Sequence, residues 1–253
     1  GEELGLINAL RPRGPDGSGV WNGKGATLVH TRLAILDLEE SGQQPMLQKH
    51  NEESAFSTAI SFNGEIYNFQ TLQKPIVEKG YILKGHSDTE YLLAHIQLFG
   101  LKKTLQKIEG MFAFALWDRK TKTLTLARDH LGKKPLYFGF CNQMLVFASE
   151  LKAFHANNKI KPALHIDRKA FASYNQHSYI PSPYSIYKNI CKLKPGHSIT
   201  ISFESQHQNL DQHNLINRMQ PYWSAQNLNK TNKNKKLKGV LKTAVEKRMI
   251  SDV

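Results

Sequence analysis

Met111-Phe112-Ala113-Phe114-Ala115-Leu116-Trp117 decides the fold, because this stretch is apolar at every position. A strand with one solvated face alternates polar and apolar side chains, so an unbroken apolar run predicts a strand covered on both faces. Shorter strands are predicted at 123–127, 135–140 and 144–148, joined by turns as in antiparallel pairing. We therefore predict an α+β fold with antiparallel sheets inside and helices outside.

A second strand, over residues 59–62, leads into the turn dipeptide Asn63-Gly64. Asn63 offers a carboxamide N–H and Gly64 an unobstructed backbone N–H, close together at the strand end. Two donors directed at one point are what a developing oxyanion requires. Taken alone, the octapeptide 61–68 is more typical of an ordinary hairpin turn, and the rest of the chain reverses that preference.

The flanking segments predict helices and loops. Residues 1–10 suit the end of a short helix, and the proline- and glycine-rich segment 11–17 suits a loop. Residues 27–38 are strand-like. Ser87 is predicted to cap a helix with Glu90 as the partner of a capping box, and Gly100 is predicted to end that helix.

The composition indicates a globular protein with a real core. Of 253 residues, 40% are hydrophobic, with 12 Phe, 9 Tyr and 3 Trp, and no apolar run approaches the roughly 20 residues of a membrane span. We expect no membrane partner and a reducing, cytoplasmic location. Cys141 and Cys191 match no zinc or redox spacing and are expected to be packing residues. The 11 histidines show no metal-ligand spacing, so no metal site is assigned.

The formal net charge of +13 raises the question of a nucleic-acid partner. Residues 230–242 hold six lysines without an acid, so much of the excess lies in one stretch. No aromatic residue interleaves with these lysines, and no nucleic-acid-binding motif is present. This pattern favours a solvated linker, and we expect no nucleic-acid partner.

Seven motifs follow one another in the chain. They are Arg13-Gly14-Pro15-Asp16, His30-Thr31-Arg32-Leu33-Ala34-Ile35, Asn63-Gly64-Glu65-Ile66-Tyr67-Asn68, Ser87-Asp88-Thr89-Glu90, Gly110-Met111-Phe112-Ala113-Phe114-Ala115, Arg128-Asp129-His130-Leu131-Gly132-Lys133-Lys134-Pro135-Leu136-Tyr137 and Phe147-Ala148-Ser149-Glu150-Leu151-Lys152. Together they resemble, over residues 10–205, the glutaminase domain of class II glutamine amidotransferases, and among these the glutamine-hydrolysing asparagine synthetases. The tail 248–253 is similar to the segment before that family's ATP-pyrophosphatase loop.

The resemblance implies the four-layer αββα sandwich of N-terminal-nucleophile hydrolases. It implies a glutaminase domain over 1–205 without its N-terminal strand, a polar Lys/Asn-rich linker over 206–236, and the first helix of an ATP-dependent synthetase domain over 237–253. No cofactor is implied for this part of the chain, while ATP and Mg²⁺ belong to the synthetase domain. The implied partners are glutamine and the chain's own C-terminal synthetase domain, which uses aspartate and ATP; a homodimer is left open.

The resemblance also implies roles for individual residues. Asn63 and the Gly64 N–H would form the oxyanion hole, Arg32 would bind the α-carboxylate of glutamine, and Asp88 its α-ammonium group. Further lining of the same pocket is implied for Glu65 and the backbone of Leu33, Ala34, Ile35 and Leu36. Without the resemblance, Arg32 could equally be a surface residue of a strand, and Asp88 a first-turn acid favoured by the helix dipole.

Two departures from the family pattern affect the expected activity. The family's nucleophilic cysteine lies in a strand upstream of Gly1, and Pro12 occupies the place of a usual histidine. Cys141 and Cys191 cannot supply an adjacent free α-amine, so this polypeptide alone is predicted to be inactive although it derives from an active amidotransferase.

Other interpretations remain open. The rival enzyme is a glutaminase domain that feeds another acceptor, such as a sugar phosphate or phosphoribosyl pyrophosphate. The non-enzymatic rival is a basic binding module. For Arg128, Asp129 and Lys134, and for Glu150 and Lys152, a structural role is favoured over an anion site.

Overall fold

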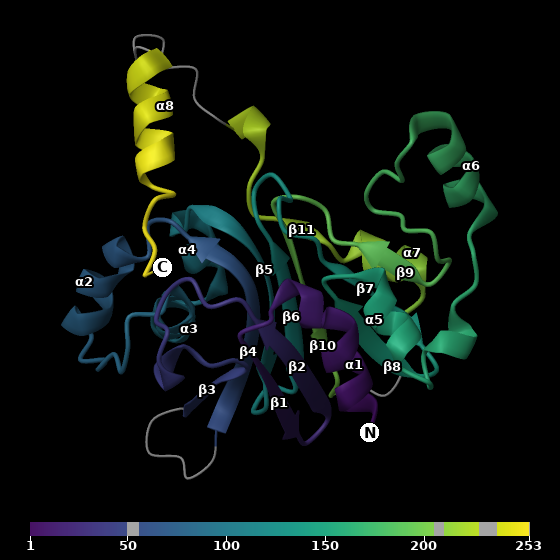
Figure 1. Ribbon diagram of the computed structural model, residues 1–253, viewed down its shortest axis with the longest axis horizontal. Helices are drawn as coiled ribbons and strands as arrows, with labels where there is room; N and C mark the ends of the chain where they lie inside the picture. The colour runs from purple at the N-terminus through teal and green to yellow at the C-terminus, as the bar shows by residue number, and fades with distance from the viewer. Residues whose placement is uncertain (50–55, 205–209, 228–236, 253) are drawn as a thin grey trace.

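The central layer of the protein is a six-stranded antiparallel sheet. The computed structural model describes residues 1–49, 56–204, 210–227 and 237–252. In spatial order the sheet comprises β11 (Gln220–Pro221), β10 (His197–Ser202), β6 (Thr123–Arg128), β5 (Gly110–Asp118), β4 (Phe56–Ile66) and β3 (Met46–Lys49). The apolar stretch that decides the fold therefore lies in the middle of the sheet, as predicted (Figure 1).

The alternation along β5 explains why both of its faces are apolar. Phe112 and Phe114 belong to one buried cluster, while Ala113 and Ala115 belong to another on the opposite face. The first cluster is covered by three helices: α2 (Gln70–Glu78), α3 (Asp88–Phe99) and α4 (Leu101–Lys107).

The second cluster packs against a second β layer. This layer contains the hairpin of β1 (Gly17–Gly23) and β2 (Ala26–Arg32) and the three-stranded sheet of β8 (Met144–Ala148), β7 (Tyr137–Cys141) and β9 (Ile190–Lys192). Helices α1 (Glu2–Leu10) and α5 (Leu151–Ala156) cover its outer side. The predicted order of helix, sheet, sheet and helix is confirmed (Figure 1).

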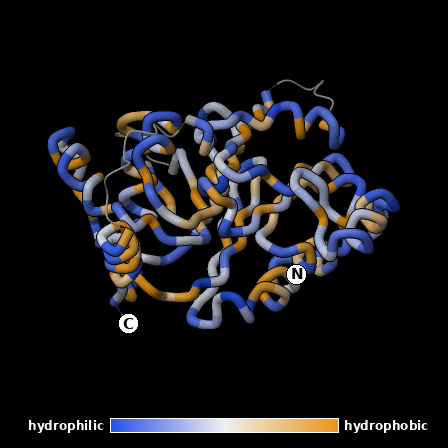
Figure 2. The backbone as a smooth tube through the Cα atoms, turned by 90° about the horizontal axis from the view of Figure 1, so that it is seen from above, coloured by the Kyte–Doolittle hydropathy of each residue, from blue (hydrophilic) through white to orange (hydrophobic). Residues whose placement is uncertain are grey.

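Four short 3₁₀ segments and three further helices complete the described elements: η1 (Arg11–Arg13), η2 (Glu40–Gly42), η3 (Lys161–Ala163), η4 (Ala225–Asn227), α6 (Arg168–His177), α7 (Gln212–Asn217) and α8 (Leu237–Glu246). Figure 2 shows that hydrophobic and hydrophilic stretches alternate along the chain, with many hydrophilic residues on the outer turns. None of the helices in the described ranges is both long enough and apolar enough to cross a bilayer.

The strand predicted over 27–38 is too long. It ends at Arg32, and the chain then bends, with Asp37 in a left-handed conformation at φ 54°. The predicted loop over 11–17 likewise contains the 3₁₀ turn η1 before β1 begins at Gly17. Apolar residues at 33, 35, 36 and 38 suggested a strand, but they do not continue the β2 ladder.

The start of α3 departs from the predicted capping box. The Ser87 hydroxyl does cap the helix, accepting a hydrogen bond from Thr89 N at 3.2 Å. Glu90, however, turns to the backbone N–H groups of Lys84 and Gly85, at 2.8 and 2.9 Å. It cannot serve the N–H of Ser87, because the Asp37 carboxylate already accepts that hydrogen bond.

The predicted linker over 206–236 includes a folded part. Leu210, Leu215 and Met219 are buried in the cluster between the two sheets, where α7 packs beside β7 and β9. Four of the six lysines at 230–242 fall within 228–236, outside the described residues. Helix α8 then stands apart from the sheets (Figure 1).

Candidate active site

A cavity of about 1080 Å³ lies between the two β layers, and residues 61–65 near the C-terminal end of β4 belong to its lining. Its lining includes Arg32, Asn63, Gly64, Glu65 and Asp88. The three residues on which the predicted site depends, at positions 32, 63 and 88, therefore share one hollow although they come from three separate segments.

The free edge of β4 presents a row of backbone N–H groups to this cavity. Alternate amides of a strand point to the same edge, so those of Phe62, Gly64 and Ile66 face one way. The Phe62 N–H donates to Gln44 Oε1 at 2.7 Å, and the Ile66 N–H donates to Asp88 Oδ2 at 2.8 Å. Because β3 pairs with β4 only as far as Ile60, the Gly64 N–H lies on the open edge between these two bonds.

Gly64 is required at this position by its backbone and by its neighbours. Its φ is +155°, and a Cβ there would lie 2.1 Å from the carbonyl oxygen of Met111 and 2.7 Å from Phe112 Cα. Both atoms belong to the backbone of β5, which pairs directly with β4. The site thus uses a glycine where two strands approach too closely for any side chain.

Replacing Gly64 by Ala is expected to destabilise the domain by roughly 3 kcal/mol, since the strained φ and the backbone clash add together. Gly80→Ala is the matched control, because Gly80 also has a positive φ, +78°, but open space around its Cβ position. We expect the control to lose only about 1 kcal/mol. Urea denaturation measures both values, and equal losses would contradict the steric account.

Asn63 points to the inner side of the sandwich. Its cross-strand partner is Ala113, whose side chain lies in the cluster between the sheets. The Asn63 Nδ2 atom donates to Ser149 Oγ at 3.3 Å, across from β4 to the end of β8. The carboxamide is thus held at the cavity wall with its second N–H hydrogen available by valence.

Asp88 is a buried carboxylate, 5% exposed, at the first position of α3. Desolvation is the main reason that its pKa rises to about 6, and the nearby Glu65 raises it further. Hydrogen bonds from the backbone of Ile66 and from Thr89 oppose this rise. A buried acid without a cation is an expensive arrangement, and it prepares the site for a positively charged ligand group.

Arg32 is also buried, at 6% exposure, so it is not a surface residue of its strand. Its two terminal nitrogens donate to the backbone carbonyls of Glu39, at 3.2 Å, and of Asp37. A guanidinium carries five N–H donors, so these bonds fix its plane and leave donors for a ligand carboxylate. Gly42 permits this packing, since a Cβ there would lie 2.2 Å from the Arg32 guanidinium.

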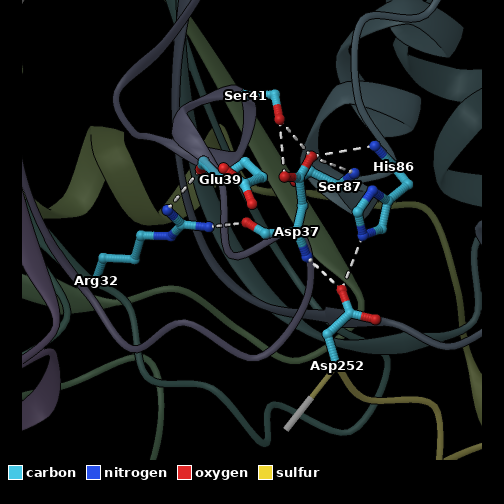
Figure 3. A network of polar contacts seen from close by, with 7 residues as sticks. All are labelled: Arg32, Asp37, Glu39, Ser41, His86, Ser87 and Asp252. Carbon is cyan, nitrogen blue, oxygen red and sulfur yellow. Dashed lines mark hydrogen bonds and ion pairs between the residues drawn. The ribbon is translucent and has the colours of Figure 1, made fainter.

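Asp37 organises the surroundings of both charged groups (Figure 3). Its carboxylate accepts hydrogen bonds from the Ser41 hydroxyl, at 2.8 Å, and from the backbone N–H groups of His86 and Ser87, at 3.1 and 3.2 Å. Its own carbonyl accepts from Arg32. One fully buried side chain therefore joins the loop that holds Arg32 to the turn that leads into Asp88.

Of the other residues predicted to line the pocket, all but Ala34 do so. Leu33, Ile35 and Leu36 line the cavity together with Glu65. Ala34 is not among the described residues that line the cavity, and its backbone N–H donates to Asp16 at 2.9 Å. Ala34 therefore supports the loop from the side of the motif at 13–16.

Two cavity residues were missed by sequence reasoning. The His30 ring lies 3.1 Å from the Ser61 hydroxyl, and burial, aided by Arg32, lowers its pKa to about 4, so the ring is neutral. Gln44 caps the β4 edge as described above. His30 lies in the motif over 30–35, and Gln44 lies outside the seven motifs. No spacing in the sequence connects either residue with the site.

The residues predicted to be structural have structural contacts. Arg128 donates to the carbonyls of Gly132, Lys134 and Leu193, and Asp129 accepts from the backbone around it, including the Phe112 N–H. Glu150 pairs with Arg13 at 2.8 Å and with Lys152 at 2.7 Å. These side chains hold loops in place, and none of them is assigned a role in ligand binding.

Cys141 and Cys191 are free, buried thiols, as predicted. Burial raises the pKa of both, that of Cys191 to about 12. Neither is among the residues that line the cavity.

Comparison with known proteins identifies the family of the chain. A family model described as "Glutamine amidotransferase domain" matches residues 4–214. The putative glutamine-hydrolysing asparagine synthetase 2 of Methanocaldococcus jannaschii is 34% identical, over 100% of this chain and 50% of its own length. Asparagine synthetase 1 of Bacillus subtilis is 36% identical over 75% of this chain and 28% of its own length, and asparagine synthetase B of Escherichia coli is 40% identical over 59% and 26%.

The solved structure of glutamine phosphoribosylpyrophosphate amidotransferase from B. subtilis superposes with a TM-score of 0.59 at 19% identity, over 86% of this chain and 45% of that one. This likeness supports the fold. The chain spans half or less of the length of these relatives. By its family match over residues 4–214, the chain belongs to the glutamine amidotransferase domains, and its fold is an αββα sandwich.

Proposed function

We propose that this domain binds L-glutamine in the cavity at the end of β4 and releases the side-chain nitrogen as ammonia by acyl transfer to a thiol. The observation that carries the proposal is the meeting of four groups around one hollow: the Asn63 carboxamide, the Gly64 N–H, the Arg32 guanidinium and the buried Asp88 carboxylate. An α-amino acid with a side-chain amide has a complementary group for each of them.

Each group has its own task in this proposal. Asp88 binds the α-ammonium group and Arg32 the α-carboxylate, which fixes the amide near Asn63 and Gly64. A thiolate attacks the amide carbon, the C–S bond forms, and the carbonyl electron pair moves to oxygen. Asn63 and the Gly64 N–H stabilise that oxyanion, a contribution typically worth 10²–10³ in kcat per donor. The C–N bond then breaks as the nitrogen takes a proton and leaves as ammonia, and water cleaves the thioester to give glutamate.

The thiol is proposed to come from outside residues 1–253, as the resemblance implies. The two thiols within the chain are buried away from the cavity, and their raised pKa values keep them protonated at neutral pH. They also lack the adjacent free α-amine that would relay the proton.

This chain on its own is accordingly expected to show no glutamine turnover. Incubation of the purified 253-residue chain with L-glutamine, followed by assays of glutamate and ammonia, measures this. Turnover above that of heat-treated protein would contradict an external nucleophile.

Glutamine binding itself tests the proposal. Titration calorimetry of the 253-residue chain with L-glutamine is expected to show saturable binding with one site. D-Glutamine, which exchanges the directions of ammonium and carboxylate, and L-asparagine, which is one methylene shorter, serve as controls and are expected to bind more weakly. An absence of heat at millimolar L-glutamine, or equal affinity for the two enantiomers, would refute the proposed site.

For the longer protein we propose glutamine-dependent asparagine synthesis in the cytoplasm. The names of the relatives support it, as does the similarity of the tail 248–253 to the segment before an ATP-pyrophosphatase loop. Aspartate, ATP and Mg²⁺ would then bind outside the described domain. An amidotransferase with another acceptor is the alternative. A coding sequence with Met-Cys-Gly upstream of Gly1 and Ser-Gly-Gly-x-Asp-Ser after Val253 is expected; a true start without cysteine would indicate a non-catalytic protein.

A further inference from the structure

We propose that Asp252 is a positioning residue for glutamine, acting through Asp37 on Arg32; this rests on the proposed function of the cavity. Asp252 is separated from Arg32, Asn63 and Asp88 by more than 160 positions in the sequence, and it comes from the segment that follows α8. It nevertheless meets the loop over 33–42, which we call the Arg32 loop because its carbonyls hold that guanidinium.

Three hydrogen bonds join Asp252 to the site, and Figure 3 shows the two that its carboxylate makes with Asp37 and His86. Its backbone N–H donates to the Ile35 carbonyl at 2.9 Å. Its Oδ2 atom accepts from the Asp37 N–H at 2.8 Å and lies 2.8 Å from His86 Nε2. The first two bonds hold the Arg32 loop, and the third reaches the turn before Asp88.

The contact with Asp37 transmits this hold to Arg32. The backbone N–H of Asp37 donates a hydrogen bond to the Asp252 carboxylate, while the Asp37 carbonyl accepts one from the Arg32 guanidinium. Asp37 also has a left-handed backbone conformation, with φ 54°. A residue other than glycine keeps this conformation only when surrounding hydrogen bonds hold it. Loss of the Asp252 carboxylate therefore removes the hydrogen bond that holds the backbone N–H of Asp37, the residue whose carbonyl orients the carboxylate-binding group.

The segment around Asp252 is attached at a second place as well. The Arg248 guanidinium lies over the Tyr67 ring, 4.6 Å from its centroid, and Lys247 pairs with Glu109 at 2.5 Å. Both partners lie at the junction of β4 and β5, beside Ile66, whose N–H donates to Asp88. Residues 247–252 thus contact both the Arg32 loop and the junction of β4 and β5.

The test compares two ligands on the 253-residue chain by titration calorimetry. L-Glutamine carries the α-carboxylate that Arg32 would bind, and 4-aminobutanamide is the same molecule without that carboxylate. Asp252→Ala is expected to weaken glutamine binding about tenfold, the effect of losing one charge-assisted hydrogen bond, and to change binding of 4-aminobutanamide less than twofold. Asp252→Asn, which keeps an acceptor for the Asp37 N–H, is expected to recover most of the glutamine affinity.

Glu246→Ala is the matched control, since it removes a nearby carboxylate at the end of α8 whose ion-pair partner among the described residues is Lys242. It is expected to leave both affinities unchanged. Wild-type affinity for glutamine in Asp252→Ala, or equal weakening of both ligands, would overturn the inference while glutamine binding by the wild-type chain still upheld the proposed function. Failure of the wild-type chain to bind glutamine would reject both together.

Discussion

Replacing Asp88 by Asn is expected to weaken glutamine binding by about 10²–10³-fold and, at the same time, to make the unliganded domain more stable. The loss follows from removing the only charge assigned to the ligand's ammonium group, because breaking a buried ion pair costs about 3–5 kcal/mol. Asn keeps an oxygen that can accept from Ile66 N, so the β4 edge retains its partner.

The gain in stability has a separate cause. The pKa of Asp88 is about 6 in the folded protein, against an ordinary value near 3.8, so folding disfavours its charged form. At neutral pH this difference corresponds to a penalty on the order of 3 kcal/mol, which Asn does not carry. We expect a gain of about 1–3 kcal/mol, a case in which a functional group opposes stability.

Calorimetry and urea denaturation measure the two effects on the same samples. Asp167→Asn is the matched control, since Asp167 is also an acid at a helix start, capping α6 outside the cavity. It is expected to keep wild-type affinity and to lose a few tenths of a kcal/mol. A stable Asp88→Asn variant with wild-type affinity would remove Asp88 from the site.

The pH dependence separates the two roles further. Because only the ionised carboxylate binds an ammonium group, glutamine affinity should fall about tenfold per unit as the pH decreases below about 6. The free energy of unfolding changes in the opposite direction. Because the pKa of Asp88 is raised in the folded protein, the folded state takes up this proton before the unfolded state as the pH falls. The cost of the buried charge therefore disappears between about pH 6 and about pH 4.

His30 contributes the opposite trend. Its pKa of about 4 in the folded protein means that, between pH 6.5 and 4, its ring is protonated in the unfolded state and neutral in the folded state, so stability falls as the pH decreases. The wild-type stability curve therefore mixes two changes of opposite sign. The difference in unfolding free energy between Asp88→Asn and wild type isolates Asp88, and we expect it to shrink as the pH falls from 7 to 4. A constant difference would contradict the buried, weakly acidic carboxylate.

Replacing Arg32 by Lys is expected to weaken glutamine binding by about 100-fold even though the charge is retained. The guanidinium donates to the Glu39 and Asp37 carbonyls and still has donors for a carboxylate, whereas an ammonium group has three donors at a single point. Lys can satisfy the loop carbonyls or the ligand, but it cannot hold the plane that serves both.

The exposed Arg119 provides the matched control for this substitution. Arg119→Lys should bind glutamine as the wild type does. The binding of 4-aminobutanamide should be nearly unaffected in Arg32→Lys, because this ligand lacks the carboxylate. Full glutamine affinity in Arg32→Lys would indicate that the carboxylate binds elsewhere.

Much of the fold follows from local pattern. The doubly apolar run of β5 predicts a covered central strand, and its alternation of Phe and Ala already separates a helix-packed face from a sheet-packed face. Residues 27–38 were harder, because an apolar composition does not reveal that the chain leaves the ladder after Arg32. That departure depends on hydrogen bonds that the Asp37 carboxylate accepts from backbone N–H groups 49 and 50 positions away.

The same limit applies to the site. Asn63, Gly64, Arg32 and Asp88 were recognised by resemblance, and their meeting required the sandwich to bring β2, β4 and α3 together. Gln44 and Asp37 act by accepting hydrogen bonds from backbone N–H groups elsewhere in the chain, which leave no periodic signal. Asp252 is more distant still, and only tertiary structure joins it to Asp37.

The central claim is that glutamine lies with its side-chain amide at Asn63 and Gly64 and its α-carbon groups at Arg32 and Asp88. Two-dimensional ¹H–¹⁵N NMR of the labelled 253-residue chain, titrated with L-glutamine, tests it most directly. We predict saturable shifts of the Gly64 amide, the Asn63 side-chain amide and the Arg32 Nε signal, all fitting one dissociation constant. Shifts confined to other parts of the chain, with these three signals unmoved at saturation, would contradict it.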